Sequence, residues 1–279
     1  MIFCGRAKRS TRWLYFGALI ATASCNLATA EEMAGVHRSE QAAQASQDQH
    51  PKPAPTGKAF DANEFSIRLV TLTHDWLANK LSTAGTSAEM REIKRERRGS
   101  DLLVAYHVFV KGAPKDQLYE LQQWPTNAEK PFVTGQGLSI ASDGLVMSQN
   151  HDVNFAFHPA KGEPYRLVLL SADGSTKIYF GVIPDPIIGE DRGCTLEAVG
   201  LLPKFPLVMI RAKGYKPSEE LQFASKSYDE AHDIQVKSDA DGEFVTAVLP
   251  KVKNKPTGKT DVTLKGAGCA PTLSFEWGK

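Results

Sequence analysis

The sequence predicts a mainly β protein, with two tandem antiparallel β-sandwich domains that follow an export signal and a disordered linker. Short segments of alternating apolar and polar residues recur from Asp101 onward, turn residues separate them, and no long helical pattern stands between them. Parallel strands need a long crossover connection, so this arrangement favours antiparallel sheets packed as sandwiches. We expect these divisions: signal peptide 1–30, linker 31–58, a sandwich-like domain with an N-terminal helical segment 59–183, and a second, immunoglobulin-like sandwich 187–279.

The N-terminus has the pattern of an export signal. A positively charged stretch ends at Arg12, a short apolar run spans 13–23, and Ala28-Thr29-Ala30 precedes Glu31 as a cleavage site. The apolar run is shorter than the roughly 20 residues of a membrane span. The sequence therefore predicts a mature chain without a transmembrane segment that is periplasmic, tethered to the outer membrane, or secreted.

Cys25 offers a second fate for the exported chain. The segment Ala21-Thr22-Ala23-Ser24-Cys25 matches a bacterial lipobox, in which a small residue precedes a cysteine that becomes lipid-modified, although Thr22 stands where Leu is usual. The protein is then either released after Ala30 or tethered through Cys25. The cleaner cleavage site favours release, with Cys25 discarded in the signal.

The linker at 31–58 is rich in Ala, Gln, Ser and Pro and has few large apolar residues. Such a segment cannot bury enough surface to offset its ordering entropy, so we expect a disordered stalk. Pro51, Pro53 and Pro55 favour an extended conformation at its end.

The start of the first domain mixes helical and strand signals. The Ile, Val and Thr content of Phe65–Leu72 predicts a strand, and His74–Leu81 a short helical turn. Thr86 and Glu89 have capping-box spacing, which predicts a short charged helix over 86–98. The alternative is that 92–97 form the first arm of a hairpin. The basic residues here alternate with glutamates and predict a solvated face: Arg91, Lys94, Arg95, Arg97 and Arg98.

From Asp101 the apolar pattern is that of a sheet. The segment Leu102–Val110 is apolar on both faces, which predicts a central strand. Further strands are expected at 118–122, 144–148, 153–157, 165–171 and 176–183. Pro184-Asp185-Pro186 predicts a short stiff hinge. Seven more strands are expected at 194–199, 207–212, 221–228, 233–237, 243–249, 260–265 and 272–277.

Two turns carry a family resemblance. Gly214-Tyr215-Lys216-Pro217 precedes one expected strand, Asp239-Ala240-Asp241-Gly242-Glu243-Phe244 precedes another, and Gly258 stands before a later one. In these features the C-terminal domain resembles the immunoglobulin-like modules of bacterial secreted and surface proteins. The whole chain is similar in style to uncharacterised exported two-domain bacterial proteins. The resemblance implies a fold and no activity.

The cysteines fit the second domain. Cys4 and Cys25 belong to the predicted signal, which leaves Cys194 and Cys269 as the pair in the exported body. In an oxidising compartment these two predict one disulfide between the start and the end of the domain.

Candidate sites for chemistry are sparse. Asp239-Ala240-Asp241-Gly242 resembles the start of a calcium loop, but its register would place Lys237 and Val248 at ligand positions, so we expect an exposed turn. His151, Asp152 and His158 are the densest possible metal ligands, yet an odd spacing puts the two histidines on opposite faces of one strand. We therefore expect no metal site, no catalytic residue and no cofactor. Trp124, which follows two glutamines and precedes Pro125, is the tryptophan expected nearest the surface.

These observations favour an exported, non-catalytic binding or structural module of the cell envelope, with a protein or glycan partner and no nucleic acid. One alternative is an accessory factor for envelope assembly or secretion that uses a sheet edge. A less favoured one is a hydrolase whose site is assembled from distant residues.

Mass spectrometry of the mature protein tests the export predictions together. We expect an N-terminus at Glu31, no lipid, and Cys194 joined to Cys269. An acylated N-terminal Cys25 would show the tethered form instead, and two free thiols would contradict the predicted bridge.

Overall fold

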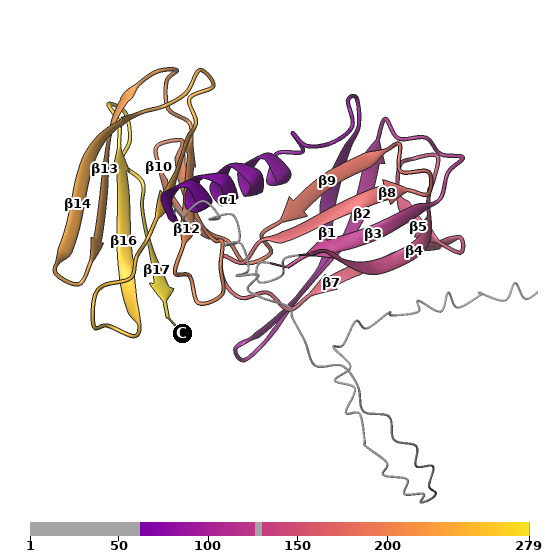
Figure 1. Cartoon of the computed structure of the whole chain (residues 1–279), viewed down its shortest axis with the longest axis horizontal. Coiled ribbons are helices and arrows are strands. Elements are labelled where there is room, and N and C mark those ends of the chain that lie inside the picture. The colour runs from indigo at the N-terminus through magenta and orange to yellow at the C-terminus, as the bar shows by residue number, and fades with distance from the viewer. Residues whose placement is uncertain (1–61, 126–129, 279) are drawn as a thin grey trace, which may run out of the picture. The chain divides into compact units, whose positions relative to one another are not determined.

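A computed structural model describes residues 62–125 and 130–278. The predicted signal peptide, Cys25 and the predicted linker lie outside the described residues. The described part is mainly β, with one helix and seventeen strands in four sheets, and every strand pairing is antiparallel (Figure 1). The predicted fold class is therefore confirmed. The described residues pack as one compact unit, so the domain limits 59–183 and 187–279 stay predictions.

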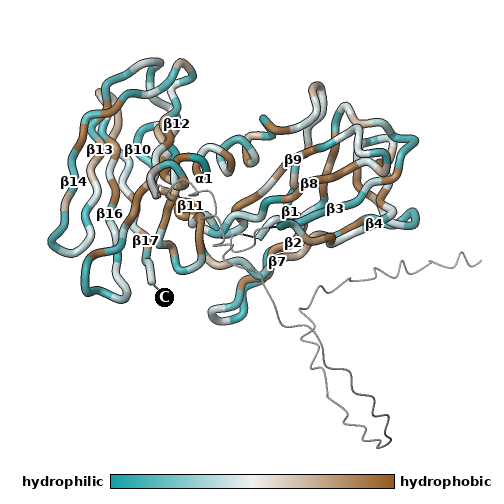
Figure 2. The backbone as a smooth tube through the Cα atoms, viewed as in Figure 1, coloured by the Kyte–Doolittle hydropathy of each residue, from teal (hydrophilic) through white to brown (hydrophobic). Residues whose placement is uncertain are grey.

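The first nine strands form two sheets that enclose one core. Their orders are β1-β2-β7 and β6-β5-β4-β3-β8-β9. Inward side chains such as Val104 and Val108 from β2 and Leu167 and Leu169 from β8 are buried in the shared core. Figure 2 shows the apolar character of β8. The strand bounds are β1 Ser87–Arg98, β2 Asp101–Lys111, β3 Tyr119–Trp124, β4 Phe132–Ile140, β5 Val146–Ser148, β6 His151–Asp152, β7 Phe155–Phe157, β8 Tyr165–Ser171 and β9 Lys177–Val182.

β2 lies between β1 and β7, as the apolar pattern on both of its faces predicts. The helix expected over 86–98 is wrong and the hairpin alternative is confirmed, because Ser87–Arg98 form β1, the first arm of a hairpin with β2. Cross-strand pairing along the whole length of β2 overrides the local capping signal. The charges of β1 face solvent and pair with one another, as in Arg95 with Glu92 at 2.6 Å.

The strand expected over Phe65–Leu72 is also wrong, because α1 spans Ala62–Leu77. Its buried side chains recur at Ser66, Val70, Thr73 and Trp76, which is the period of a helix. The β-branched residues of this segment lie among these buried positions and on the exposed face, so their strand propensity is overridden by packing.

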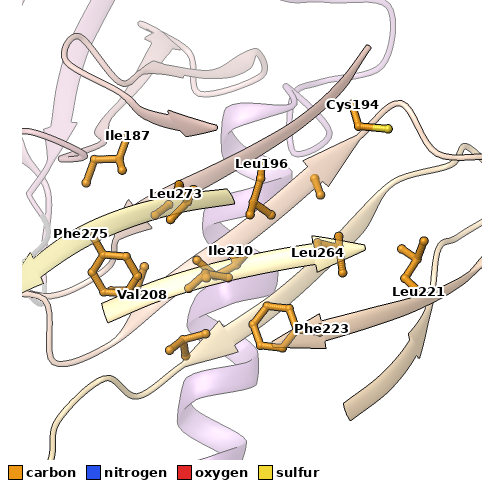
Figure 3. Packing of buried hydrophobic residues seen from close by; sticks show 14 of the residues in the cluster. Ile187, Cys194, Leu196, Val208, Ile210, Leu221, Phe223, Leu264, Leu273 and Phe275 are labelled. Atoms are coloured by element: carbon orange, nitrogen blue, oxygen red, sulfur yellow. The ribbon is translucent and has the colours of Figure 1, made fainter. Parts of the chain in front are cut away.

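The last eight strands form a second pair of four-stranded sheets, ordered β10-β11-β12-β15 and β14-β13-β16-β17. Figure 3 shows Leu196 and Ile210 of one sheet near Phe223 and Leu264 of the other in the core between them. The strand bounds are β10 Ile187–Asp191, β11 Cys194–Gly200, β12 Val208–Lys213, β13 Glu220–Ser227, β14 Glu230–Lys237, β15 Phe244–Val248, β16 Gly258–Lys265 and β17 Thr272–Trp277.

Three strands were not expected from the sequence. β4 contains Gly135 and Gly137, which weaken a strand pattern. β6 has only two residues. β10 begins directly after Pro186, where the prolines predict a hinge.

The edges β10 and β17 approach each other closely. A Cβ at Gly189 of β10 would overlap the Thr272 carbonyl oxygen of β17. Only glycine allows the two backbones to come this near.

Helix α1 contacts strands from both pairs of sheets. On one side, Trp76 Nε1 donates to the carbonyl oxygens of Leu167 in β8 and Phe180 in β9, each at 2.9 Å. On the other side, Val70 packs in a cluster with Val199 of β11 and Met209 of β12. The helix therefore buries two faces, one against each set of strands.

Arg166 of β8 lies beneath the same helix. Its guanidinium is buried, donates to Thr73 Oγ1 at 3.4 Å and to the Pro125 carbonyl at 3.2 Å, and lies over the Trp76 ring. Burial lowers the pKa of Arg166 from its ordinary value. The contact between α1 and β8 is thus partly polar.

Trp76→Phe tests the contribution of the Trp76 N–H. The substitution keeps an aromatic ring but leaves two buried carbonyl groups without this donor, so we expect a loss of about 2 kcal/mol in the free energy of unfolding, measured by urea denaturation. Tyr179→Phe is a matched control, because the Tyr179 ring packs edge-on against Trp76 at 4.8 Å and loses only its hydroxyl. Equal midpoints for Trp76→Phe and the unmodified protein would contradict this role.

Candidate ligand pocket

A pocket of about 420 Å³ lies between β10, β16, β17, the loop after β11 and the loop that contains Lys161. This volume is within the range of about 300–1,000 Å³ that is typical of ligand sites. Its walls are largely apolar: Ile187, Phe205, Phe275 and Trp277. Three of these, all except Phe205, also belong to the core between the second pair of sheets. Part of the pocket wall is therefore formed by residues of that core.

The loop between β11 and β12 holds two pocket residues in unusual backbone conformations. Lys204 and Phe205 have φ angles of 64° and 53°, in the left-handed region that non-glycine residues rarely occupy. Such strain persists only where the surroundings impose it, and it is concentrated at functional sites. Here Gly278 N donates to the Lys204 carbonyl at 2.7 Å and Phe205 N to the Leu202 carbonyl at 3.0 Å.

The Phe205 ring is also fixed by contact. A Cβ at Gly200 would overlap Phe205 Cε1, so the ring packs directly on the Gly200 backbone. Any larger residue at 200 would displace the ring from the pocket wall.

The main chain at Lys161 is fixed by two backbone hydrogen bonds of the next residue, Gly162. Gly162 N donates to the Asp185 carbonyl at 2.6 Å, and Gly200 N donates to the Gly162 carbonyl at 2.9 Å. These bonds join the loop before β8 to the segment before β10 and to the end of β11. Hydrogen bonds therefore connect backbone segments around the pocket that are far apart in the sequence.

The rim of the pocket is positively charged. Lys161, Lys204 and Lys259 line it together with one acidic residue, Glu276. Lys259 pairs with Asp261 at 3.3 Å and stands opposite Glu276 in the β16–β17 ladder. Lys161 and Lys204 are exposed and make no ion pair with any other residue in the described part of the chain. Neither ammonium group lies within 4 Å of a carboxylate of the described residues.

The predicted disulfide between Cys194 and Cys269 is present, with 6.2 Å between the two Cα atoms. The cysteines are 75 residues apart. Closing a loop of that length stabilises the fold by about 4 to 5 kcal/mol in the chain-entropy model. The bridge ties the start of β11 to the turn before β17.

The histidines singled out as possible metal ligands lie on different elements. His151 is exposed in β6, and His158 follows β7, where its Nδ1 lies 3.0 Å from Asp101 Oδ1. Among the described residues there is no group of three or more potential metal ligands.

The Asp239–Gly242 segment forms a turn in which the Asp239 carboxylate accepts hydrogen bonds from backbone N–H groups that follow it in the sequence. Asp239 Oδ1 accepts hydrogen bonds from Asp241 N at 2.9 Å and from Glu243 N at 2.8 Å. This arrangement is typical of an Asx turn.

Trp124 is half-buried, whereas Trp76 and Trp277 are buried. It packs edge-on against Trp76 with ring centroids 5.5 Å apart. Part of its surface is thus already covered by α1.

The pocket residues Lys161, Lys204 and Phe205 were missed in the sequence because they come from separate segments with no recognised motif. One local signal was present. Pro203 and Pro206 enclose Lys204 and Phe205, and prolines on both sides of two residues indicate a constrained loop.

No protein-family model matches the chain. No curated protein matches it either. Among solved structures, it is similar to a DUF3823 family protein from Bacteroides ovatus ATCC 8483, with 10% sequence identity and a TM-score of 0.20. That match covers 70% of this chain and 99% of the other. A likeness at this level carries no argument about function.

The described residues include no helix with the length and hydropathy of a membrane span.

Proposed function

We propose that this protein is an exported, non-catalytic binding protein of the cell envelope, and that the pocket beside β10 and β17 is its binding site. The observation that carries the proposal is that the pocket has apolar walls and that hydrogen bonds fix the backbone around them. Binding sites are typically preformed apolar concavities with a few polar groups at fixed positions. The immunoglobulin-like character of the second sandwich remains part of this proposal.

Two further observations support it. A disulfide is expected in an oxidising compartment, which agrees with an export signal. The pocket lining includes one carboxylate and neither histidine nor cysteine, so it lacks the carboxylate pair of a glycosidase and the histidine base of a serine or cysteine hydrolase.

Binding of the neutral fluorophore N-phenyl-1-naphthylamine to the mature protein tests the proposal. We expect one saturable site, and Ala160→Trp, which places an indole at the pocket mouth, should weaken binding by about tenfold or more, equivalent to the loss of one good apolar contact. Ala231→Trp is the matched control, because Ala231 is exposed on β14 and does not line the pocket. Equal binding by Ala160→Trp and Ala231→Trp would rule out this pocket as the site.

A second candidate function is assembly through a sheet edge. The observation in its favour is that β14 is an exposed edge strand. This strand pairs with β13 alone among the described strands, and seven of its eight residues are exposed. Ile234 is an apolar residue of this edge with 52% of its surface exposed. An exposed edge strand can pair with an extended segment of another chain.

A photo-crosslinking residue placed at Ile234 in producing cells tests the edge. We expect a covalent adduct with one defined protein, because an open strand edge would hold its partner within reach of the probe. The control site is Glu190, which is exposed on β10 and should give no such adduct. The absence of an adduct at Ile234, or the same adduct at Glu190, would refute an assembly role for β14.

A further inference from the structure

We propose that the pocket selects a small amphiphilic anion, with one negatively charged head group and an apolar aromatic or acyl body. This inference rests on the proposed function, because it assigns the ligand class of the same pocket. Two features of the pocket lead to this inference. Two of its lysines have no ion-pair partner among the described residues, and its aromatic wall includes residues of the core.

The charge of the head group follows from the rim. Three lysines face one glutamate across the lining, and Asp261 already compensates Lys259. The remaining positive charges are those of Lys161 and Lys204. An ammonium group binds a carboxylate, sulfonate or phosphate through charge-assisted hydrogen bonds, so the rim favours an anion over a neutral group.

The character of the body follows from the walls. Phe275 and Trp277 are buried residues of β17, Ile187 is a buried residue of β10, and all three line the pocket. Phe205 packs against the same core, lines the pocket and is only partly buried, so its ring presents apolar surface to a ligand. An apolar body that displaces water from these walls adds to the affinity in proportion to the area it buries.

The positions of the two lysines are set before any ligand binds. The Lys204 carbonyl accepts from Gly278 N, and both backbone polar groups of Gly162, next to Lys161, are hydrogen-bonded. A site whose backbone is already ordered loses less entropy on binding. Only the lysine side chains remain to be ordered.

A pair of related fluorophores separates the head group from the body. 8-Anilino-1-naphthalenesulfonate and N-phenyl-1-naphthylamine share the same aromatic body, and only the first carries a sulfonate. We expect the mature protein to bind the sulfonate about tenfold more tightly, the effect of two exposed ion pairs. Higher ionic strength should remove most of this preference, because salt screens exposed charges.

Lys161→Ala/Lys204→Ala is the deciding variant. It should bind both fluorophores with equal affinity, because the sulfonate then lacks these two cationic partners. Lys251→Ala/Lys253→Ala is the matched control, because both lysines are exposed and neither lines the pocket. This control should keep the preference for the sulfonate.

Each outcome has a distinct meaning. Equal affinities in the unmodified protein, or a preference that survives Lys161→Ala/Lys204→Ala, would overturn the selection of an anion while leaving the pocket as a binding site. Neutral-probe binding that Ala160→Trp does not weaken would instead overturn the proposed function itself. Displacement of the sulfonate probe by decanoate would support a free amphiphile as ligand, and co-sedimentation with phosphatidylglycerol vesicles that needs both lysines would support the same chemistry in a lipid head group.

Discussion

The indole N–H of Trp76 is shared by two carbonyl oxygens, one on β8 and one on β9, and the position of α1 depends on it. The ring is almost completely buried, so these carbonyls have no water to replace the donor. Thr73 and Arg166 add a polar contact beside the indole, and Val70 on another face of the helix enters an apolar cluster with β11 and β12. A single helix thus supplies a buried surface to two sets of strands, β8 with β9 and β11 with β12, and in the described chain no hydrogen-bonded ladder joins one set to the other.

The second pair of sheets is constrained in a different way. Its core is an ordinary sandwich interior with alternating inward residues, and the Cys194–Cys269 bridge adds a covalent restraint near one end. The pocket lies where this core meets the loops of Lys161 and Lys204. The backbone at Lys204 and Phe205 has left-handed φ angles and is held by one hydrogen bond from Gly278, just after β17, and by one within the loop, from Phe205 N to the Leu202 carbonyl.

Period-two alternation was enough to predict the fold class and most strands, because each sheet has one face in a core. The same reasoning failed at α1, where β-branched residues conceal a helical period that becomes evident only when the buried positions are known. It also failed at β1, where a capping-box spacing is local and the pairing with β2 is not. The disulfide was predictable because only two of the four cysteines lie outside the predicted signal peptide. The pocket was not, since it is assembled from five separate segments of the sequence.

The close approach of β10 and β17 at Gly189 gives the second sandwich two unlike sides. On that side the two backbones are in contact, so no third strand fits between them. On the opposite side β14 presents a strand edge that is open in the described chain. Strand pairing through β14 therefore uses one side of this sandwich only. A pair of copies joined edge to edge through β14 would close on itself, whereas a fibre needs two complementary edges on each subunit.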